Sequence, residues 1–185
     1  MAAREFHGSE TAAHEPDPML PAALGLIEAI SIFSVLSDDE RQALATSATP
    51  RSFSAGEEIV RKGSALDSLM IIKAGIVTMR DGDDEVARLT PGDFFGEQGS
   101  LAGVEEIHTL QAVTRVTAFE LDQKAFAPLL KERPELADEL AANLAHRENA
   151  AMGFRFQPAQ PEHRRLDLLK RIRSIFRICP NQSVS

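Results

Sequence analysis

Between Arg51 and Asp122 the sequence alternates short apolar segments with residues that turn the chain, and this pattern constrains the fold more than any other feature. The segments are β-branched or alternate apolar with polar residues, and Gly, Asp-Gly or Pro-Gly separates them. They are Phe53, Ile59-Val60, 69–72, 76–79, 86–89, 107–113 and 116–121. Roughly eight short strands with a turn every 8 to 12 residues predict a closed antiparallel roll or barrel.

Helical patterns flank these strands on both sides. Ser37 and Glu40 fit a capping box, in which each side chain caps the backbone N–H of the other. The helices predicted around the strands cover 21–33, 38–47, 123–131 and 135–149. The fold class is therefore mainly β with flanking α, an antiparallel β-roll (jelly roll) of about eight strands with N-terminal and C-terminal helices.

The last predicted helix, 163–178, is amphipathic and basic, with Leu168, Ile172 and Phe176 on one arc and most basic residues on the other. Residues 163–177 hold six basic and one acidic residue, so the rest of a chain of net charge −8 carries −13. Three roles are open: packing against the roll, binding a partner protein or a second copy, and membrane contact. Anionic lipid would repel the acidic remainder, which disfavours the membrane.

The predicted division of the chain is an arm 1–20, a domain 21–150, a linker 151–162, the basic helix and a tail 179–185.

Composition and charge narrow the class of protein. The acidic balance argues against nucleic acid as a partner. We predict a cytoplasmic location for three reasons. The chain has a single cysteine, which suits a reducing compartment, residues 1–19 contain no apolar run, and no window of 18 residues is apolar.

The sequence lacks the patterns of common enzyme sites. The five histidines include no His-x-His pair and no histidine beside a strand carboxylate at ligand spacing. There is no Gly-x-Ser-x-Gly, no P-loop and no Gly-rich dinucleotide motif. We therefore expect no catalytic residue, no metal ion and no resident cofactor.

The segment 91–97, Pro-Gly-Asp-Phe-Phe-Gly-Glu, packs small, acidic and aromatic residues at turn spacing between predicted strands. Its two glycines let the backbone approach another molecule closely, and Glu97 can accept hydrogen bonds from hydroxyl groups. The segment predicts either a polyol-binding elbow or a Pro-Gly turn that leads into a buried Phe pair.

Residues 32–146 resemble the cyclic nucleotide-binding domain family, the module of catabolite activator-type regulators, cyclic-nucleotide-dependent kinases and nucleotide-gated channels. The resemblance rests on Phe53-x-x-Gly56 with Ile59-Val60, on Gly63 followed by 67–72 and 75–77, and on the segment 91–97. The end of the basic helix, 166–176, looks like the tails of bacterial small-conductance mechanosensitive-type channels that end in such a domain.

The resemblance implies a phosphate-binding cassette that starts at Phe95-Gly96-Glu97. In the family the Glu takes the ribose 2′-hydroxyl, and an Arg followed by Ser or Thr, about nine residues later, holds the cyclic phosphate. Gly96 and Glu97 match, and Gln98 would offer its backbone N–H. Counted without gaps, the Arg position is Glu106 and the hydroxyl position is Ile107.

A carboxylate in place of the phosphate-binding cation predicts weak or absent binding of cAMP or cGMP, because losing a buried charge partner costs about 3 to 5 kcal/mol. Arg88, Lys73 and Arg115 could supply another cation, although solvated strand faces are the simpler interpretation. His108 could approach the phosphate when protonated. Phe94 and Phe95 could stack on a purine, but at least one should belong to the core.

The leading hypothesis is a non-enzymatic regulatory module with a cyclic nucleotide-binding fold and a degenerate cassette, with cAMP or cGMP as its only candidate ligand. One alternative is a ligand-free protein-interaction domain, and another is a detached cytoplasmic regulatory part of an ion channel. A transcription factor is disfavoured, since the 36 residues after Asn149 leave no room for a helix-turn-helix domain.

Overall fold

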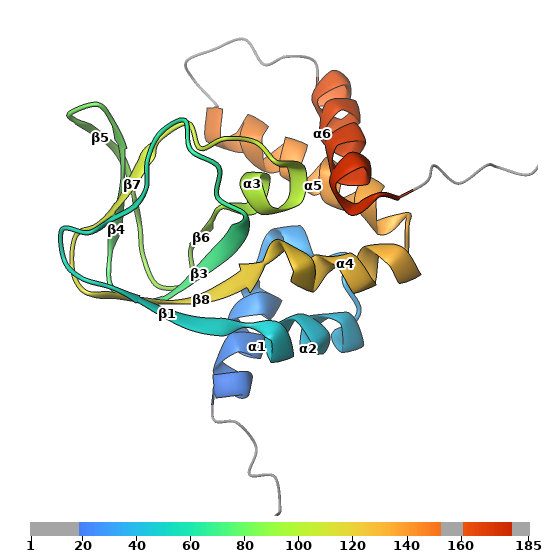
Figure 1. Cartoon of the computed structure of the whole chain (residues 1–185), viewed down its shortest axis with the longest axis horizontal. Helices are drawn as coiled ribbons and strands as arrows, with labels where there is room; N and C mark the ends of the chain where they lie inside the picture. Colours follow the sequence, from blue (N-terminus) through green and yellow to red (C-terminus); the bar gives the residue numbers. More distant parts are fainter. Residues whose placement is uncertain (1–18, 153–160, 179–185) are drawn as a thin grey trace, which may run out of the picture.

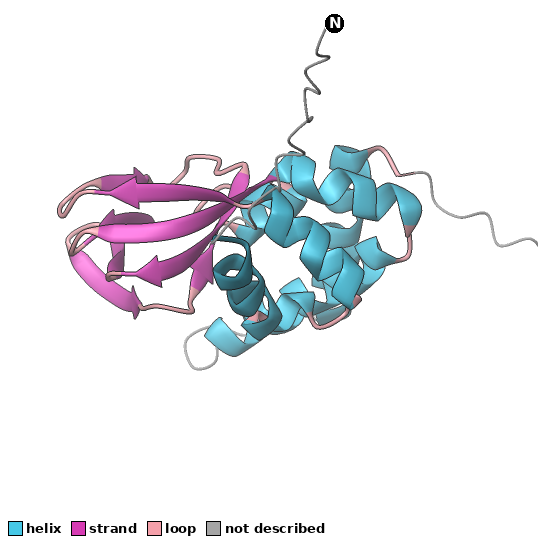
Figure 2. Ribbon diagram, turned by 90° about the horizontal axis from the view of Figure 1, so that it is seen from below, coloured by secondary structure: helices cyan, strands magenta, loops and turns pink. Residues whose placement is uncertain are grey.

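The computed structural model describes residues 19–152 and 161–178. Its strands gather at one end of the molecule and its helices at the other (Figures 1 and 2). The strands are β1 (Thr49–Phe53), β2 (Glu58–Val60), β3 (Ser68–Ala74), β4 (Val77–Asp81), β5 (Asp84–Leu89), β6 (Phe94–Phe95), β7 (Thr109–Ala112) and β8 (Val116–Asp122). They form two antiparallel four-stranded sheets, ordered β1-β8-β3-β6 and β2-β7-β4-β5.

Helices precede, interrupt and follow these strands. They are α1 (Met19–Ala29), the 3₁₀ turn η1 (Ser31–Phe33), α2 (Asp38–Ser47), α3 (Glu97–Ala102), α4 (Gln123–Glu132), α5 (Leu136–Met152) and α6 (Pro161–Phe176). The predicted class, an antiparallel β-roll with N-terminal and C-terminal helices, is confirmed. Residues 1–18 of the predicted arm, most of the predicted linker and the predicted tail lie outside the described residues, whereas residues 19 and 20 of the predicted arm belong to α1.

Strands β3 and β8 join two hydrophobic cores. Because successive side chains of a strand point to opposite faces, Met70 and Ile72 pack inside the roll while Leu69 and Ile71 pack under the helices. Strand β8 repeats this division, and in β6 Phe95 enters the roll while Phe94 joins the helical core. The central strands are therefore buried on both faces, which explains their continuous apolar runs.

Most predicted elements differ from the structure by a few residues at their ends, and two of the differences have a clear physical reason. The helix predicted over 21–33 is interrupted at Ile30, whose φ of −80° and ψ of 117° are extended. An unbroken helix would put Ile30 and Ile32 about 200° apart, whereas the break lets both reach the core. The strand predicted over 107–113 spans only 109–112, because its pairing with β4 begins at Thr109 opposite Arg80.

Helix α6 packs with its apolar side against the rest of the protein. Leu168, Ile172 and Phe176 are buried in the helical core. Helix α6 lies mainly against α5 and α3, and the Arg165 guanidinium pairs with the Asp138 carboxylate of α5 at 2.7 Å. Of the roles left open for this helix, packing on the domain is the one that the structure describes.

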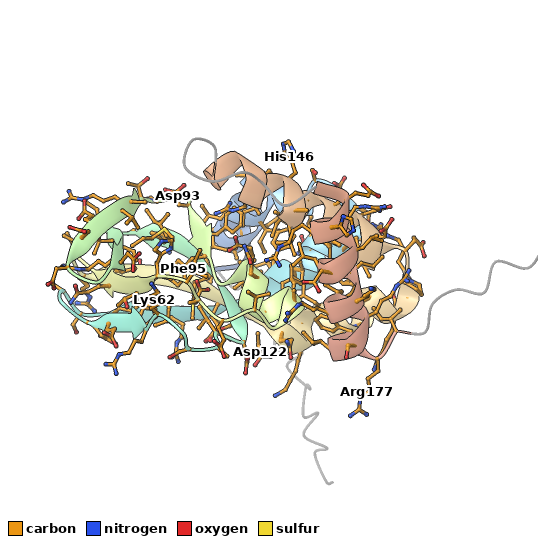
Figure 3. All side chains as sticks on the ribbon, turned by 90° about the horizontal axis from the view of Figure 1, so that it is seen from above. Lys62, Asp93, Phe95, Asp122, His146 and Arg177 are labelled. Atoms are coloured by element: carbon orange, nitrogen blue, oxygen red, sulfur yellow. The ribbon has the colours of Figure 1, made fainter. Side chains whose placement is uncertain are left out.

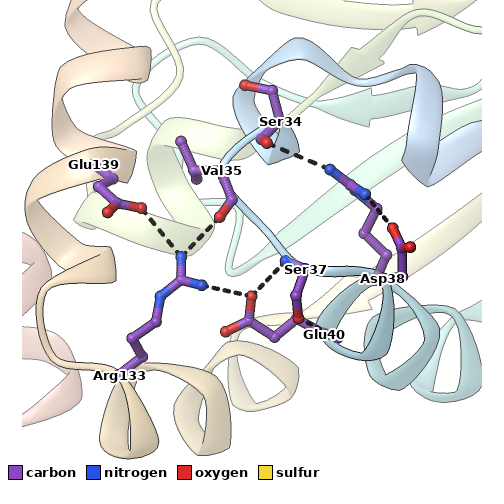
Figure 4. A network of polar contacts seen from close by, with 8 residues as sticks. Ser34, Val35, Ser37, Asp38, Glu40, Arg133 and Glu139 are labelled. Carbon is purple, nitrogen blue, oxygen red and sulfur yellow. Dashed lines mark hydrogen bonds and ion pairs between the residues drawn. The ribbon is translucent and has the colours of Figure 1, made fainter.

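Arg133, directly after α4, binds to α2, to the turn before α2 and to α5 (Figure 4). Its guanidinium donates to the Glu40 carboxylate at 2.9 Å, to the Val35 carbonyl at 2.8 Å and to the Glu139 carboxylate at 3.1 Å. Glu40 also accepts from the Ser37 backbone N–H at 2.7 Å, which completes the predicted capping box of α2. One planar cation thus links α2, the segment before it and α5.

We expect Arg133→Met to lower the free energy of unfolding by about 2 to 3 kcal/mol, since the substitution leaves the half-buried Glu40 carboxylate without its cation. Arg133→Lys keeps the charge but not the planar guanidinium that donates to several acceptors at once, so its loss of unfolding free energy should be smaller, about 1 kcal/mol. Urea denaturation measures both. The control Arg61→Met removes an exposed pair with Glu58 and should change stability by less than about 0.5 kcal/mol. Equal losses in the Arg133→Met and Arg61→Met variants would contradict the role of Arg133.

Candidate functional site

A tight turn leads the chain into the site. The backbone N–H of Asp93 donates to the Thr90 carbonyl at 2.9 Å, and Gly92 has a φ of 95°, as the third residue of a type II turn requires. The Asp93 carboxylate accepts from the Thr90 N–H at 2.7 Å and from its hydroxyl at 3.0 Å. The Pro-Gly turn and the buried Phe pair expected at 91–97 are both present.

Helix α3 follows β6 through a crowded junction that only glycine fits. Gly96 has a φ of 80°, and a β-carbon there would meet the Ser68 carbonyl and the Leu66 side chain. A β-carbon at Gly99 would meet the Leu66 carbonyl. The helix ends at Gly103, also left-handed, whose N–H donates to the Gly99 carbonyl at 2.9 Å. These glycines hold α3 against the chain that enters β3.

A cavity of about 410 Å³ lies beside α3. Its apolar wall comes from the second sheet, with Met79, Leu89 and Leu110. Residues 94–98 and 104–108 form the sides, and Arg147 of α5 and Arg164 of α6 reach it from the helical end. The volume is in the range of small-ligand sites. A wider hollow of about 770 Å³ lies on the other side of 104–108 and includes Lys62 and Arg171.

The buried carboxylate of Glu97 is paired with Arg147. The Arg147 Nε lies 3.2 Å from Glu97 Oε1, and its Nη2 donates to the Phe94 carbonyl at 3.2 Å. The guanidinium carbon lies 3.7 Å from the centre of the Phe94 ring, a cation–π contact. Glu97 is only 9% exposed, so this pair supplies the cation that its burial requires.

Glu106 has a strongly perturbed carboxyl group. Burial, with the nearby Glu97 charge as a second cause, raises the pKa of Glu106 to about 7. Among the described residues no Lys, Arg or His nitrogen lies within 4 Å of its carboxylate, and its backbone is fixed by pairing with Gly63 and Ser64. Near neutral pH this side chain is divided between acid and carboxylate.

The residues expected from the sequence to form the site lie together around this cavity. Gly96, Glu97, Gln98, Glu106 and Ile107 all line it. Ile107 is 59% exposed and forms part of the rim.

The three basic residues considered as substitutes for the phosphate-binding cation are exposed and lie outside the cavity. Arg88 pairs with Glu85 at 2.8 Å. Lys73 lies 5.6 Å from the centre of the Phe119 ring. The simpler interpretation of these residues, as solvated strand residues, is therefore the correct one for this structure.

His108 and the two phenylalanines differ in part from expectation. His108 precedes β7 instead of lying in it, and its buried Nδ1 has no hydrogen-bond partner among the residues that the structure describes. Phe94 and Phe95 are both buried, and Arg147 stacks on Phe94. Figure 3 shows Phe95 among the strands, whereas His146, one residue before Arg147, points away from the body of the protein. The periodicity of α5 thus turns Arg147 inward.

Sequence reasoning missed Arg147 and Arg164. Both arginines lie more than 40 residues after the segment 91–106, which contains most of the expected cassette residues, so no local spacing in the sequence connects them to it. The available signal was weak: Arg147 follows Leu140 and Leu144 on the predicted apolar face of its helix, where a charged residue needs a partner.

Residues 19–152 and 161–178 contain neither a cluster of metal ligands nor a membrane-spanning helix. In these ranges no three His, Cys, Asp or Glu side chains are grouped so as to hold a metal ion. No helix of this part of the chain combines the length and apolarity needed to cross a membrane.

Sequence comparison relates the chain to known regulators. Residues 50–133 match the family model of the cyclic nucleotide-binding domain. A cyclic nucleotide-gated potassium channel of Rhizobium etli is 31% identical over 115 residues, 62% of this chain and 32% of the channel. A cAMP-dependent protein kinase type II regulatory subunit of Drosophila melanogaster is 32% identical over 110 residues, 57% of this chain and 29% of the subunit. The chain thus spans about a third of these relatives.

Structure comparison gives the same fold. The N-terminal domain of a transcriptional regulator from Streptomyces coelicolor matches with a TM-score of 0.58 and 22% identity, over 71% of this chain and 98% of that one. The regulatory domain of Toxoplasma gondii PKA with cAMP matches with a TM-score of 0.57 and 21% identity, over 69% and 50% of the two chains. The match of residues 50–133 to the family model and the β-roll agree, so this part of the chain is similar to the cyclic nucleotide-binding domain in sequence and in fold.

Proposed function

We propose that this protein is a non-enzymatic regulatory module whose phosphate-binding cassette is degenerate, so that it binds cAMP and cGMP weakly or not at all. The observation that carries the proposal is Glu106, a partly buried carboxyl group in the cavity without a cation within 4 Å among the described residues. A cyclic phosphate placed beside it would meet a carboxylate where the family has a guanidinium. The missing attraction corresponds to about two to four decades of affinity.

The two arginines of the cavity do not restore the family arrangement. Arg147 is engaged with Glu97, the residue expected to receive the ribose hydroxyl. Arg164 is 29% exposed at its side chain and lies 3.4 Å from the Asp167 carboxylate. Both arginines come from helices α5 and α6, so they approach from the helical end of the cavity and not from the loop 104–108.

The output of the module would pass through α5 and α6. Arg147 links α5 to the cassette, and Arg165 links α6 to α5. Any ligand that contacts Arg147 or Arg164 therefore changes the free energy of one helix position relative to another. The exposed basic side of α6 would present this change to a partner protein or a second copy in the cytoplasm.

A ligand-free interaction domain is the second candidate, and Arg147 favours it. The guanidinium pairs with Glu97, bonds to the Phe94 carbonyl and covers the Phe94 ring, so it satisfies the groups that a ligand would otherwise contact. In that case α5 is held against the roll without any ligand. The third candidate, a regulatory part of an ion channel, is supported by the similarity to the Rhizobium etli channel.

Glu106→Arg tests the proposed degeneracy of the cassette. The substitution places a cation where the family has one, so we expect the affinity for cAMP to rise at least about tenfold over the unmodified chain. Isothermal titration with cAMP and cGMP at low salt measures the change. The control Glu132→Arg adds the same charge on an exposed site of α4 and should leave the affinity unchanged. Tight binding of cAMP by the unmodified chain, below about 10 μM, would refute the proposal.

Glu106 also predicts a pH dependence of stability. Its pKa of about 7 in the folded protein lies above the ordinary 4.5, so the folded state holds the proton more tightly than the unfolded state. This contribution to stability is complete below pH 4.5 and is lost as the pH rises to about 7. The variant Glu106→Gln has no ionisable group at this position. Its free energy of unfolding should therefore rise by about 1 to 2 kcal/mol relative to that of the unmodified chain between pH 4.5 and 8.

Urea denaturation of both proteins at several pH values measures this difference, because the two chains differ only at residue 106. Glu132→Gln removes an exposed carboxylate and serves as the control. A stability difference between the Glu106→Gln variant and the unmodified chain that stays constant from pH 4.5 to 8 would show that the Glu106 carboxyl has an ordinary pKa.

A further inference from the structure

The shape of the 410 Å³ cavity limits its occupant to one small molecule. One wall is apolar, formed by Met79, Leu89 and Leu110 of the second sheet. The carboxyl groups of Glu97 and Glu106 and the guanidinium groups of Arg147 and Arg164 also line the cavity, and we call this part of the lining its polar end. This division suits a ligand with a flat, weakly polar ring system at one end and hydrogen-bonding groups at the other.

The charges of the polar end disfavour an anion. Glu97 and Glu106 both line the cavity, and Glu105 lies at its edge. Glu97 is compensated by Arg147, whereas Glu106 has no cation within 4 Å among the described residues. A phosphate or carboxylate on the ligand would be brought next to an acid that already avoids ionisation because of its burial.

The same end disfavours a cation. Arg147 and Arg164 both line the cavity, and Arg147 already occupies the ring face of Phe94, the contact that an organic cation would seek. The charges of two guanidinium groups and three carboxyl groups nearly cancel, because the Glu106 carboxyl is only partly ionised. An uncharged ligand therefore incurs the least electrostatic cost.

Donors and acceptors occur together in this part of the lining. The carboxylate of Glu97 accepts, the guanidinium of Arg147 donates, and the Gln98 amide can do both. A pair of neighbouring hydroxyl groups, each both a donor and an acceptor, matches this arrangement better than a single polar atom. A ribose without a phosphate carries such a pair.

From these observations we infer that the cavity takes an uncharged nucleoside in preference to a cyclic nucleotide, with the base against the apolar wall and the ribose hydroxyls at Glu97 and Arg147. The inference rests on the proposed function, because it requires that the cassette has no phosphate-binding cation. It goes further by assigning a ligand to the cavity.

The test is isothermal titration of the full chain with adenosine, guanosine, cAMP, cGMP and AMP in one buffer. We expect adenosine or guanosine to saturate with a Kd below about 100 μM, and each phosphate-bearing ligand to bind at least about tenfold more weakly. The 2′-deoxy form of the nucleoside that binds should lose at least about tenfold, since it lacks the hydroxyl assigned to Glu97. This arm needs no protein variant, so folding defects cannot imitate it.

A pair of variants on one strand locates the binding. Leu89→Trp should fill the cavity and abolish nucleoside binding, whereas Val86→Trp, on an exposed position of the same strand β5, should not. Circular dichroism and the urea midpoint check that both variants are folded. Should Leu89→Trp destabilise the fold, the 2′-deoxy comparison still decides the question.

The outcomes separate this inference from the proposed function. Binding of cAMP or cGMP that is tighter than that of any nucleoside and lies below about 10 μM overturns both, whereas weaker cyclic nucleotide binding that still exceeds nucleoside binding overturns only the inference. No binding of any of the five ligands by the folded chain overturns the inference and leaves the degenerate cassette standing. Nucleoside binding that is indifferent to the 2′-hydroxyl, or that survives in a folded Leu89→Trp variant, also overturns the assignment of the ligand to this cavity.

Discussion

The structure depends on two strands, β3 and β8, that are buried on both of their faces. Side chains of β3 and β8 alternate between the interior of the roll and the helical core, so neither core forms without these strands. The alternation continues through Phe94 and Phe95, which brings the Phe94 ring and its carbonyl to the helical side. There they meet Arg147. The arrangement of the cavity thus follows from the same period of two that builds the roll.

Burial of one carboxylate determines how the helices meet the cassette. Glu97 begins α3 at a glycine junction that presses the helix against the chain entering β3, which removes its side chain from water. A carboxylate in this position needs a cation, and Arg147 supplies it from a helix 50 residues later. The ion pair costs desolvation of both groups, so its clearest effect is to specify where α5 lies.

Local chemistry made the roll predictable, whereas the site depended on distant contacts. Turn glycines and the capping box of Ser37 and Glu40 act within a few residues, and the structure reproduces them. The interruption at Ile30 was missed because only packing decides that both Ile30 and Ile32 must be buried. The five expected site residues line the cavity, but Arg147 and Arg164 were missed, since their position follows from the docking of α5 and α6.

The arginines of the cavity come from its helices, and this ties occupancy of the cavity to helix position. A cation within the cassette loop could hold a ligand without moving a helix. Arg147 instead serves the domain and a ligand with the same guanidinium: a ligand that draws it away from Glu97 loosens α5, and one that shares the pair strengthens the contact. The direction of any response therefore depends on whether the ligand replaces Arg147 at Glu97 or binds beside it.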